Sequence, residues 1–361
     1  MSFSPSIAGS SEAVGPSGLL ARVRALHSPE TYPDPAVDLE SIETHFAWVF
    51  LVGELAYKLK KPVKNGRLDL RELEARRWSC EEEVRLNRVL APDVYLGVVP
   101  LVCQGDRFRI GGEGVIVDWL VKMRRLPRTL MLDRAIRTGT VAEPALEALG
   151  RRLAGFYQTQ PHIAFEPEQY ICRIAEQIHA DRRALLAPEL NLHAHCLRAA
   201  LRATWCAFSQ IEPELVQRAL ENRIVEAHGD LRPEHICLED PPCVIDSLEF
   251  SKDLRTLDPA EELAFLWVEC EQEGDERPAK KIFDAYRRAS GDPVSERLLD
   301  FYRSRRAMVR AKIVAWHLND PAVMHQAPWA ERADGYIKKA ERYALRAMGT
   351  DPDDDEECGP L

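Results

Sequence analysis

The sequence lacks the features that mark membrane-spanning, secreted and zinc-binding proteins. The apolar run at residues 46–57 is interrupted by Gly53 and Glu54 and is shorter than the ~20 residues that a spanning helix needs. The first twenty residues contain neither a basic segment nor a continuous apolar segment, so no secretory signal is expected. The nine cysteines form no Cys-x-x-Cys pair, which disfavours a thiolate zinc site and a disulfide framework. We therefore expect a cytoplasmic protein without a membrane segment.

The sequence also lacks an excess of positive charge. Lysine and arginine number 48 against 58 aspartates and glutamates, which gives a net charge of -10. A protein with this charge is not expected to bind nucleic acid or an anionic membrane over a broad surface. The Walker A pattern of P-loop proteins is absent as well. Apolar residues make up 45% and charged residues 29% of the chain, as in globular proteins, so most of the 361 residues should fold.

Both ends of the chain have the composition of mobile segments. Residues 1–30 begin with a stretch rich in serine, glycine and proline, and residues 347–361 carry the acidic sequence DPDDDEEC. We therefore predict a disordered N-terminal segment over 1–30 and an acidic mobile tail over 347–361, with the folded part between them.

Between these ends, the pattern changes from mixed to helical near residue 125. Residues 31–125 combine strand-like and helical segments, whereas residues 126–346 are mainly amphipathic runs with helical spacing. The predicted strands of the first part cover 46–60, divided by a turn at Gly53 and Glu54, 98–102 and 114–121, and its helix covers 70–90. We therefore predict an α+β fold in which a small antiparallel-sheet lobe with one helix precedes a larger, mainly helical lobe.

Two loop segments within the helical part carry chemically informative residues. Residues 228–238 read HGDLRPEHICL, and residues 244–250 read VIDSLEF. Phosphoryl transfer needs one carboxylate that orients the acceptor hydroxyl and takes its proton, and a second that holds the magnesium ion on the nucleotide phosphates. We assign these roles to Asp230, with His228 stabilising its loop, and to Asp246. The alternative is that Asp230 caps a turn and Asp246 forms a strand-end salt bridge.

Upstream residues fit the same chemistry. Residues two apart in a strand share a face, so Ala56 and Lys58 should point together, the alanine beneath an adenine ring and the ammonium group at the phosphates. Glu83, beside an apolar helical face, is positioned to pair with Lys58. The alternative is that Lys58 belongs to a solvated basic edge and that the glutamate run 81–83 merely favours a helix start.

In this order, LAYK, a helix glutamate, HGDLRPEH and VID resemble the aminoglycoside phosphotransferase and choline kinase branch of the bilobal protein-kinase-like fold. The chain is more narrowly similar to an uncharacterised bacterial group of such domains, some of which are fused to a C-terminal P-loop ATPase. The resemblance spans about residues 36–345, and the stretches that carry the narrow match are AYKLKKPV (56–63), EEEVRLNRVLAPDVYLGVVPL (81–101), VKMRRLP (121–127) and LDPAEELAFL (257–266).

The resemblance implies a function and several further assignments. It implies an ATP- and magnesium-dependent enzyme that moves the γ-phosphate of ATP to a hydroxyl group of a small molecule. Residues 118–124 would be the hinge between the lobes, so that Asp118 and Leu120 would contact the nucleotide, and Asp258 and Glu262 would brace the catalytic loop (228–238). By the same resemblance, a separately encoded ATPase is a candidate partner.

Two departures from the family pattern leave alternatives open. His235 stands five residues after Asp230, where these kinases usually have a metal-binding asparagine, and residues 41–45 (SIETH) stand where a glycine-rich phosphate-covering turn is expected. Either the site prefers Mn²⁺, or Asp246 alone holds one metal, or His235 only forms a local hydrogen bond. The rival function is a non-catalytic or regulatory nucleotide-binding module, or an enzyme that phosphorylates or nucleotidylates a protein.

Overall fold

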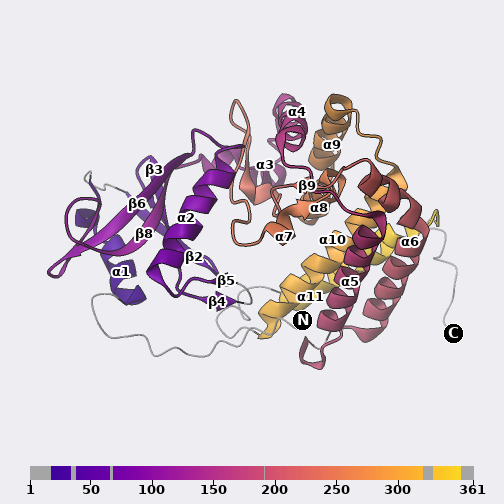
Figure 1. Cartoon of the computed structure of the whole chain (residues 1–361), viewed down its shortest axis with the longest axis horizontal. Coiled ribbons are helices and arrows are strands. Elements are labelled where there is room, and N and C mark those ends of the chain that lie inside the picture. The colour runs from indigo at the N-terminus through magenta and orange to yellow at the C-terminus, as the bar shows by residue number, and fades with distance from the viewer. Residues whose placement is uncertain (1–17, 34–37, 66–67, 191, 320–327, 351–361) are drawn as a thin grey trace.

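The computed structural model of the chain describes residues 18–33, 38–65, 68–190, 192–319 and 328–350. A sheet-rich lobe, on the left in Figure 1, contains the first third of the chain, and a helical lobe on the right contains the remainder. The predicted α+β fold with an antiparallel sheet and a mostly helical remainder is therefore confirmed.

A six-stranded antiparallel sheet with the order β1-β2-β3-β8-β6-β7 forms the first lobe. Its strands are β1 (Leu39–Glu43), β2 (Ala47–Val52), β3 (Leu55–Lys60), β6 (Tyr95–Gln104), β7 (Arg107–Ile110) and β8 (Val115–Arg124). A short hairpin, β4 (Lys64–Asn65) and β5 (Leu68–Asp69), leads from β3 into the helix α2 (Leu73–Asn87). The turn between β2 and β3 contains Gly53 at a φ of 53°, a conformation that glycine adopts without strain.

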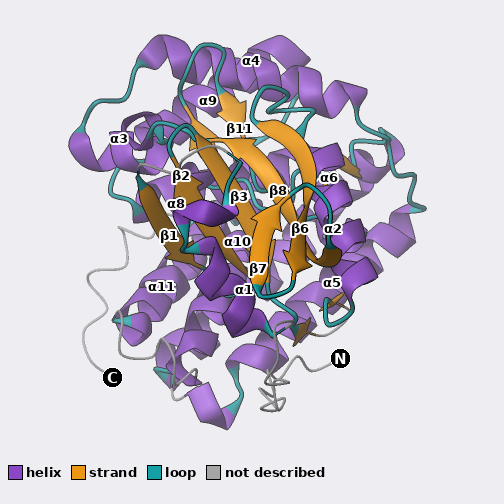
Figure 2. Cartoon of the chain, turned by 90° about the vertical axis from the view of Figure 1, so that its left-hand side faces the viewer, coloured by secondary structure: helices purple, strands orange, loops and turns teal. Residues whose placement is uncertain are grey.

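The alternation of side chains along β3 separates the two faces of this sheet. Tyr57 and Leu59 are fully or almost fully buried against the short helix α1 (Leu19–Leu26), which covers the outer face in front of the sheet in Figure 2. Ala56 points to the opposite face, where it packs with α2 and with residues of the second lobe. Because the side-chain period of a strand is two, Lys58 and Lys60 lie on this inner face with Ala56. The inner face is therefore the one that carries the candidate site.

The prediction of disorder over residues 1–30 is wrong for the part that the structure describes. Residues 19–26 form α1, and Pro29–Thr31 form a turn of 3-10 helix, η1. Val23 and Leu26 of α1 are buried in the core against the sheet, and the serine-, glycine- and proline-rich stretch that suggested disorder ends before this apolar helix begins. The predicted acidic tail also begins too early, because the last helix continues to Ala347. Residues 1–17 and 351–361 lie outside the described residues.

The second lobe consists mainly of helices. They are α3 (Leu132–Thr138), α4 (Glu143–Thr159), α5 (Pro167–Leu185), α6 (Ala194–Leu220), α7 (Lys252–Arg255), α8 (Pro259–Gln272), α9 (Arg277–Ser290), α10 (Glu296–Trp316) and α11 (Trp329–Ala347), with the 3-10 turns η2 (Arg128–Leu130), η3 (Pro188–Leu190), η4 (Pro233–His235) and η5 (His317–Asn319). The short strands β9 (Val225–Glu226) and β12 (Thr256–Leu257) pair with each other, as do β10 (Ile236–Cys237) and β11 (Cys243–Val244). These four strands frame the predicted catalytic and metal loops.

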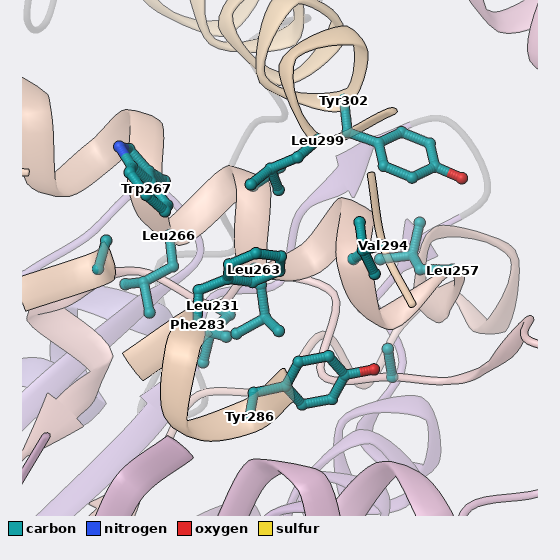
Figure 3. Close-up of a cluster of buried hydrophobic side chains, with 14 of the residues drawn as sticks. Leu231, Leu257, Leu263, Leu266, Trp267, Phe283, Tyr286, Val294, Leu299 and Tyr302 are labelled. Atoms are coloured by element: carbon teal, nitrogen blue, oxygen red, sulfur yellow. The ribbon is translucent and has the colours of Figure 1, made fainter. Parts of the chain in front are cut away.

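Helix α8 is the centre of the second lobe. Every residue from Pro259 to Cys270 is buried, as expected for a helix that is enclosed on all sides. Figure 3 shows Leu263 and Leu266 of α8 among side chains of α9 and α10, including Phe283 and Leu299. A rigid packed core thus lies directly behind the loop segments that carry the predicted chemistry.

Two helices of this lobe approach each other unusually closely. A Cβ atom added at Gly150 of α4 would lie 2.5 Å from the carbonyl oxygen of Ile282 and 2.6 Å from the Cβ of Ala285, both in α9. The α4–α9 packing therefore requires glycine at position 150.

Among the described helices, none has both the length and the apolar character needed to cross a membrane.

Candidate active site

The catalytic loop is held by a buried carboxylate of α8. Glu262 accepts hydrogen bonds from the backbone N–H groups of Gly229 at 2.5 Å and His228 at 3.1 Å, and from the Tyr157 hydroxyl at 2.8 Å. Gly229 has a φ of 90°, which a residue with a side chain rarely adopts. The side chain of Asp230, which follows, is 24% exposed and so remains accessible. The bracing role that the family resemblance gave to Glu262 agrees with these contacts.

His228 is a positioning residue in this structure. Its ring is 2% exposed, its Nε2–H donates to the carbonyl of Ile245 at 2.9 Å, and its Nδ1 accepts the backbone N–H of Asp230 at 3.3 Å. Burial of the ring lowers the pKa of His228 from 6.5 to about 4. The assignment of His228 as a catalytic group is therefore corrected, because a neutral ring with both nitrogens engaged links the catalytic loop to the metal loop (residues 244–250) instead.

This burial makes the stability of the metal-free protein dependent on pH. The unfolded chain takes up a proton on His228 near pH 6.5, whereas the folded protein resists protonation until about pH 4. The contribution is thus fully present above pH 6.5 and is lost as the pH falls to 4. We expect the wild type to lose about 3 kcal/mol more unfolding free energy than His228→Asn between pH 7 and pH 4. Urea unfolding in EDTA measures this, and parallel pH profiles of the two proteins would contradict it.

The metal loop is attached to the first lobe through its backbone. The N–H of Asp246 donates to the Tyr95 hydroxyl at 3.0 Å, and the N–H of Ser247 donates to Asn87 Oδ1 at 2.9 Å. Asn87 in turn donates to the carbonyl of Glu83. Asp246 has a φ of 65°, a left-handed conformation that costs a non-glycine residue about 1–2 kcal/mol. Contacts from α2 and β6 therefore hold the aspartate in a strained conformation, as is common at functional sites.

Lys58 lies between the two carboxylates expected around it. Its Nζ is 2.9 Å from Glu83 Oε1 and 2.5 Å from Asp246 Oδ1. Burial opposes ionisation of Asp246, but the charge of Lys58 and its hydrogen bond hold the pKa of Asp246 well below its usual range. The sequence anticipated the first of these pairs, and the structure adds the second.

A second lysine extends the network. Lys60 is 3% exposed, and its Nζ is 2.6 Å from Glu83 Oε2 and also binds Glu249. Glu249 accepts a further hydrogen bond from the Ser79 hydroxyl at 3.1 Å. Two lysines and three carboxylates thus connect β3, α2 and the metal loop, with one more negative than positive charge. A cation therefore fits the site electrostatically.

The ring of His235 bridges the two aspartates. Its Nδ1 is 2.9 Å from the backbone carbonyl of Asp230 and 3.6 Å from the Asp230 carboxylate, and its Nε2 is 3.6 Å from Asp246 Oδ2. A proton on Nδ1, donated to the carbonyl, leaves Nε2 with a free lone pair toward Asp246, which is the tautomer that a metal ligand needs. The residues present therefore fit a divalent ion. No group of three or more His, Cys, Asp or Glu side chains poised to hold a metal occurs among the described residues, so phosphate and water would complete the coordination.

The prediction that Asp118 and Leu120 contact the nucleotide is wrong. Asp118 is fully buried in ion pairs with Arg22 at 2.6 Å and Arg76 at 2.7 Å, and Leu120 is fully buried in the core under α1. The predicted hinge at 118–124 forms strand β8, which pairs with β3 and β6 and continues to Arg124. The backbone of β8 is used in sheet pairing, so it is not free to bind adenine. The connection between the lobes therefore begins after Arg124 and comprises residues 125–131.

A cavity of about 620 Å³ opens beside this connection. Its lining residues are Ile42 of β1 and, from the second lobe, Arg128, Thr129, Met131, Asp133, Arg134, Arg137 and Glu234. Met131 of this lining also packs against the apolar cluster that contains Ala56 of the inner sheet face together with Cys237 and Cys243. Glu234 follows Asp230 by four residues, so the cavity ends at the catalytic loop.

The turn between β1 and β2, whose Phe46 ring lies 6.2 Å from the Phe250 ring of the metal loop, has no glycine. Residues 41–43 belong to β1, so the turn comprises residues 44–46. Thr44 accepts the N–H of Ala47 on its hydroxyl, and Lys61 donates to the Thr44 carbonyl and pairs with Glu43, both at 2.6 Å. Side-chain contacts thus fix a turn that glycines would otherwise leave flexible.

Several contributors to the site were not predicted. Tyr95 and Asn87 gave no signal, because their contacts to the metal loop span more than 150 residues. Lys60 gave a signal, since it shares the face of Lys58 on β3. Glu234 lies inside the catalytic-loop motif itself, where its carboxylate was not considered.

The chain matches a known protein-family model. The model described as "Phosphotransferase enzyme family" matches residues 69–301, which include Glu83, the catalytic loop and the metal loop. Uncharacterised proteins of Mycobacterium tuberculosis and Mycobacterium bovis are 31% identical to the chain over 290 residues. The alignment covers 78% of this chain and 55% of each relative, so the chain spans about half the length of the curated relatives it matches.

Solved structures with lower identity also align over most of the chain. A choline/ethanolamine kinase family protein from Mesorhizobium loti is 17% identical and covers 91% of this chain and 98% of its own, with a TM-score of 0.49. An ethanolamine kinase from Plasmodium vivax is 10% identical and covers 84% of this chain and 81% of its own, with a TM-score of 0.47.

Proposed function

Because the chain belongs to the phosphotransferase enzyme family, we propose that it transfers the γ-phosphate of ATP to a hydroxyl group of a small molecule. Family membership confirms the resemblance on which the sequence expectation was based. The observation that carries the proposal is that Asp230 and Asp246 both lie 3.6 Å from one imidazole ring, with Lys58 on the far side of Asp246. Asp230, which would orient the acceptor hydroxyl, therefore lies close to Asp246, which would bind the metal ion, and to Lys58, which would bind the phosphates.

The protein residues have distinct roles in this proposal. Lys58 binds the α- and β-phosphates, and Glu83 and Lys60 keep its side chain extended. Asp230 accepts a hydrogen bond from the acceptor hydroxyl and takes its proton as the new oxygen–phosphorus bond forms. Asp246 and His235 would hold a divalent ion, which would neutralise charge on the phosphates. Glu262 and His228 keep the two loops in register.

The cavity beside the lobe connection is the proposed nucleotide site. Ile42 and Met131 offer apolar surface for the base, and Ala56 leaves room behind it. The carboxylates of Asp133 and Glu234 line the same cavity and can accept hydrogen bonds from ribose hydroxyls. The three arginines of the lining, Arg128, Arg134 and Arg137, add positive charge for phosphate groups.

A second candidate is a nucleotide-binding module without phosphoryl transfer. The observation in its favour is that His235 stands at a metal-ligand position and that Lys58 already occupies one oxygen of Asp246. In this case nucleotide binding would persist, but Asp230 would be dispensable for function.

Nucleotide binding tests the proposal first. A ligand that binds only the folded state raises the melting temperature. We expect ATP with Mg²⁺ or Mn²⁺ at about 100 times its Kd to stabilise the protein by about 3 kcal/mol, which a thermal-shift titration detects as several degrees. The variant His235→Asn should favour Mg²⁺ over Mn²⁺ more strongly than the wild type does. No shift with either metal at millimolar ATP would refute nucleotide binding, and an unchanged metal preference would remove His235 from the metal site.

A further inference from the structure

Helix α10 places four arginines in the interior of the second lobe. Arg303, Arg305, Arg306 and Arg310 are each 9% exposed or less. A buried guanidinium group is costly unless carboxylates and hydrogen bonds compensate its charge. The partners of each arginine therefore indicate where an additional anion would be stabilised.

Arg303 and Arg306 have less compensation than the other two arginines, and the guanidinium group of Arg303 stacks on Trp267, 3.6 Å from the ring centroid. Arg305 pairs with Glu261 at 3.0 Å and donates to Gln177 at 2.5 Å, and Arg310 pairs with Glu269 at 3.0 Å. Arg306 shares the same Glu261 oxygen, at 3.1 Å, and within the described part of the chain its buried Nη2 atom meets no hydrogen-bond acceptor. One carboxylate thus serves two buried cations, which leaves Arg306 with donor capacity to spare.

This spare donor is close to the catalytic loop. Arg306 and Arg310 lie over the ring of Phe265, with guanidinium carbons 5.4 and 6.0 Å from its centroid. Phe265 follows Glu262 by three residues and so shares its helix face, and Glu262 holds Gly229 beside Asp230. Burial opposes the charge of Arg310, but Glu269, Tyr336 and Asp230 raise its pKa. The two guanidinium groups thus pack on the face of α8 whose Glu262 holds the catalytic loop.

We propose that the acceptor carries an anionic group, a phosphate or a carboxylate, which binds Arg306 with the support of Arg310 while its hydroxyl faces Asp230. This inference rests on the proposed phosphotransferase function and adds the chemical class of its acceptor. A guanidinium group presents a planar pair of donors that matches both anions. A cationic acceptor would instead place a further positive charge beside two arginines, which Coulomb repulsion disfavours.

Anion binding to the whole protein tests this proposal. With saturating Mg²⁺ and a non-hydrolysable ATP analogue in the nucleotide site, inorganic phosphate or malonate should raise the melting temperature above that in chloride of equal ionic strength. The anion that acts identifies the group on the acceptor. Arg306→Gln should weaken this anion binding about 10-fold or more, as expected for the loss of a charge-assisted hydrogen bond. Arg297→Gln makes the same charge change at the exposed end of α10 and should leave anion binding unchanged.

The possible outcomes separate the two proposals. If neither anion stabilises the wild type beyond chloride, or if both variants bind it as the wild type does, the anionic acceptor is refuted. If Arg306→Gln does not fold, Arg306→Lys, which keeps the charge but loses the planar fork, should still bind the anion more weakly, and unchanged binding would refute the proposal. Absence of a shift with the ATP analogue alone would instead count against the nucleotide site, and the anion titration without analogue would still decide the role of Arg306.

Discussion

Asp230→Asn should lower the rate of phosphoryl transfer by a factor of about 10² to 10⁴ and leave ATP binding nearly unchanged. Asparagine keeps the size of the side chain but cannot take the proton of the acceptor hydroxyl, and general-base catalysis contributes a factor of this order. The loop should keep its shape, because Glu262 and His228 hold its backbone without using the Asp230 carboxylate. The measurement is ADP release, with an acceptor or with water in its place, beside a thermal-shift titration with ATP.

A matched control exists in the same segment. Asp240 is exposed on the turn between β10 and β11, so Asp240→Asn changes the same charge away from the cleft and should leave the rate unchanged. An Asp230→Asn protein that retains the wild-type rate would favour the nucleotide-binding module over the enzyme. A variant that loses ATP binding as well would show that Asp230 supports the loop rather than the chemistry.

Gly150→Ala should destabilise the protein by about 3 kcal/mol. The added methyl group would lie 2.5 Å from the backbone oxygen of Ile282, which cannot move without displacing α9. Overpacking of a closely packed core costs about 1–3 kcal/mol, and backbone atoms yield less than flexible side chains do. Thermal or urea unfolding of the variant measures the loss.

Gly155→Ala in the same helix supplies the control. A Cβ atom at this exposed position would meet nothing within 4 Å, so the higher helix propensity of alanine should stabilise the protein by about 0.5–1 kcal/mol. The two identical substitutions, five residues apart, should therefore have opposite signs. Equal changes in unfolding free energy would mean that the α4–α9 contact has room for a methyl group at position 150.

The sequence predicted which side chains of β3 share a face, but it did not predict which residues are buried. The period of two in β3 correctly grouped Ala56 with Lys58, and local spacing joined Asp230 to its loop. The same period could not distinguish the two faces of β8, because Leu120 and Val121 are adjacent and both fully buried, one on each face. The hinge was therefore assigned to residues that form a strand.

Burial also explains two of the other errors. A histidine two residues before an aspartate looks the same in sequence whether its ring faces solvent or core, and the burial of His228 follows only from the packing of the second lobe. The short helix α1 is mostly apolar, but it directly follows the serine-, glycine- and proline-rich stretch, and the sheet face that buries it is built from strands later in the chain. Tertiary contacts of this kind carry no local signature.

The ion pair of Lys58 with Asp246 has a consequence for the order in which ligands enter. In the ligand-free protein, the ammonium group already occupies one oxygen of the carboxylate that a divalent ion would use. A divalent ion alone would have to displace the lysine, whereas a nucleoside triphosphate would attract the lysine to its phosphates and free the carboxylate oxygen in the same event. We therefore expect the metal ion and the nucleotide to bind together. A divalent ion without nucleotide should bind the ligand-free protein only weakly.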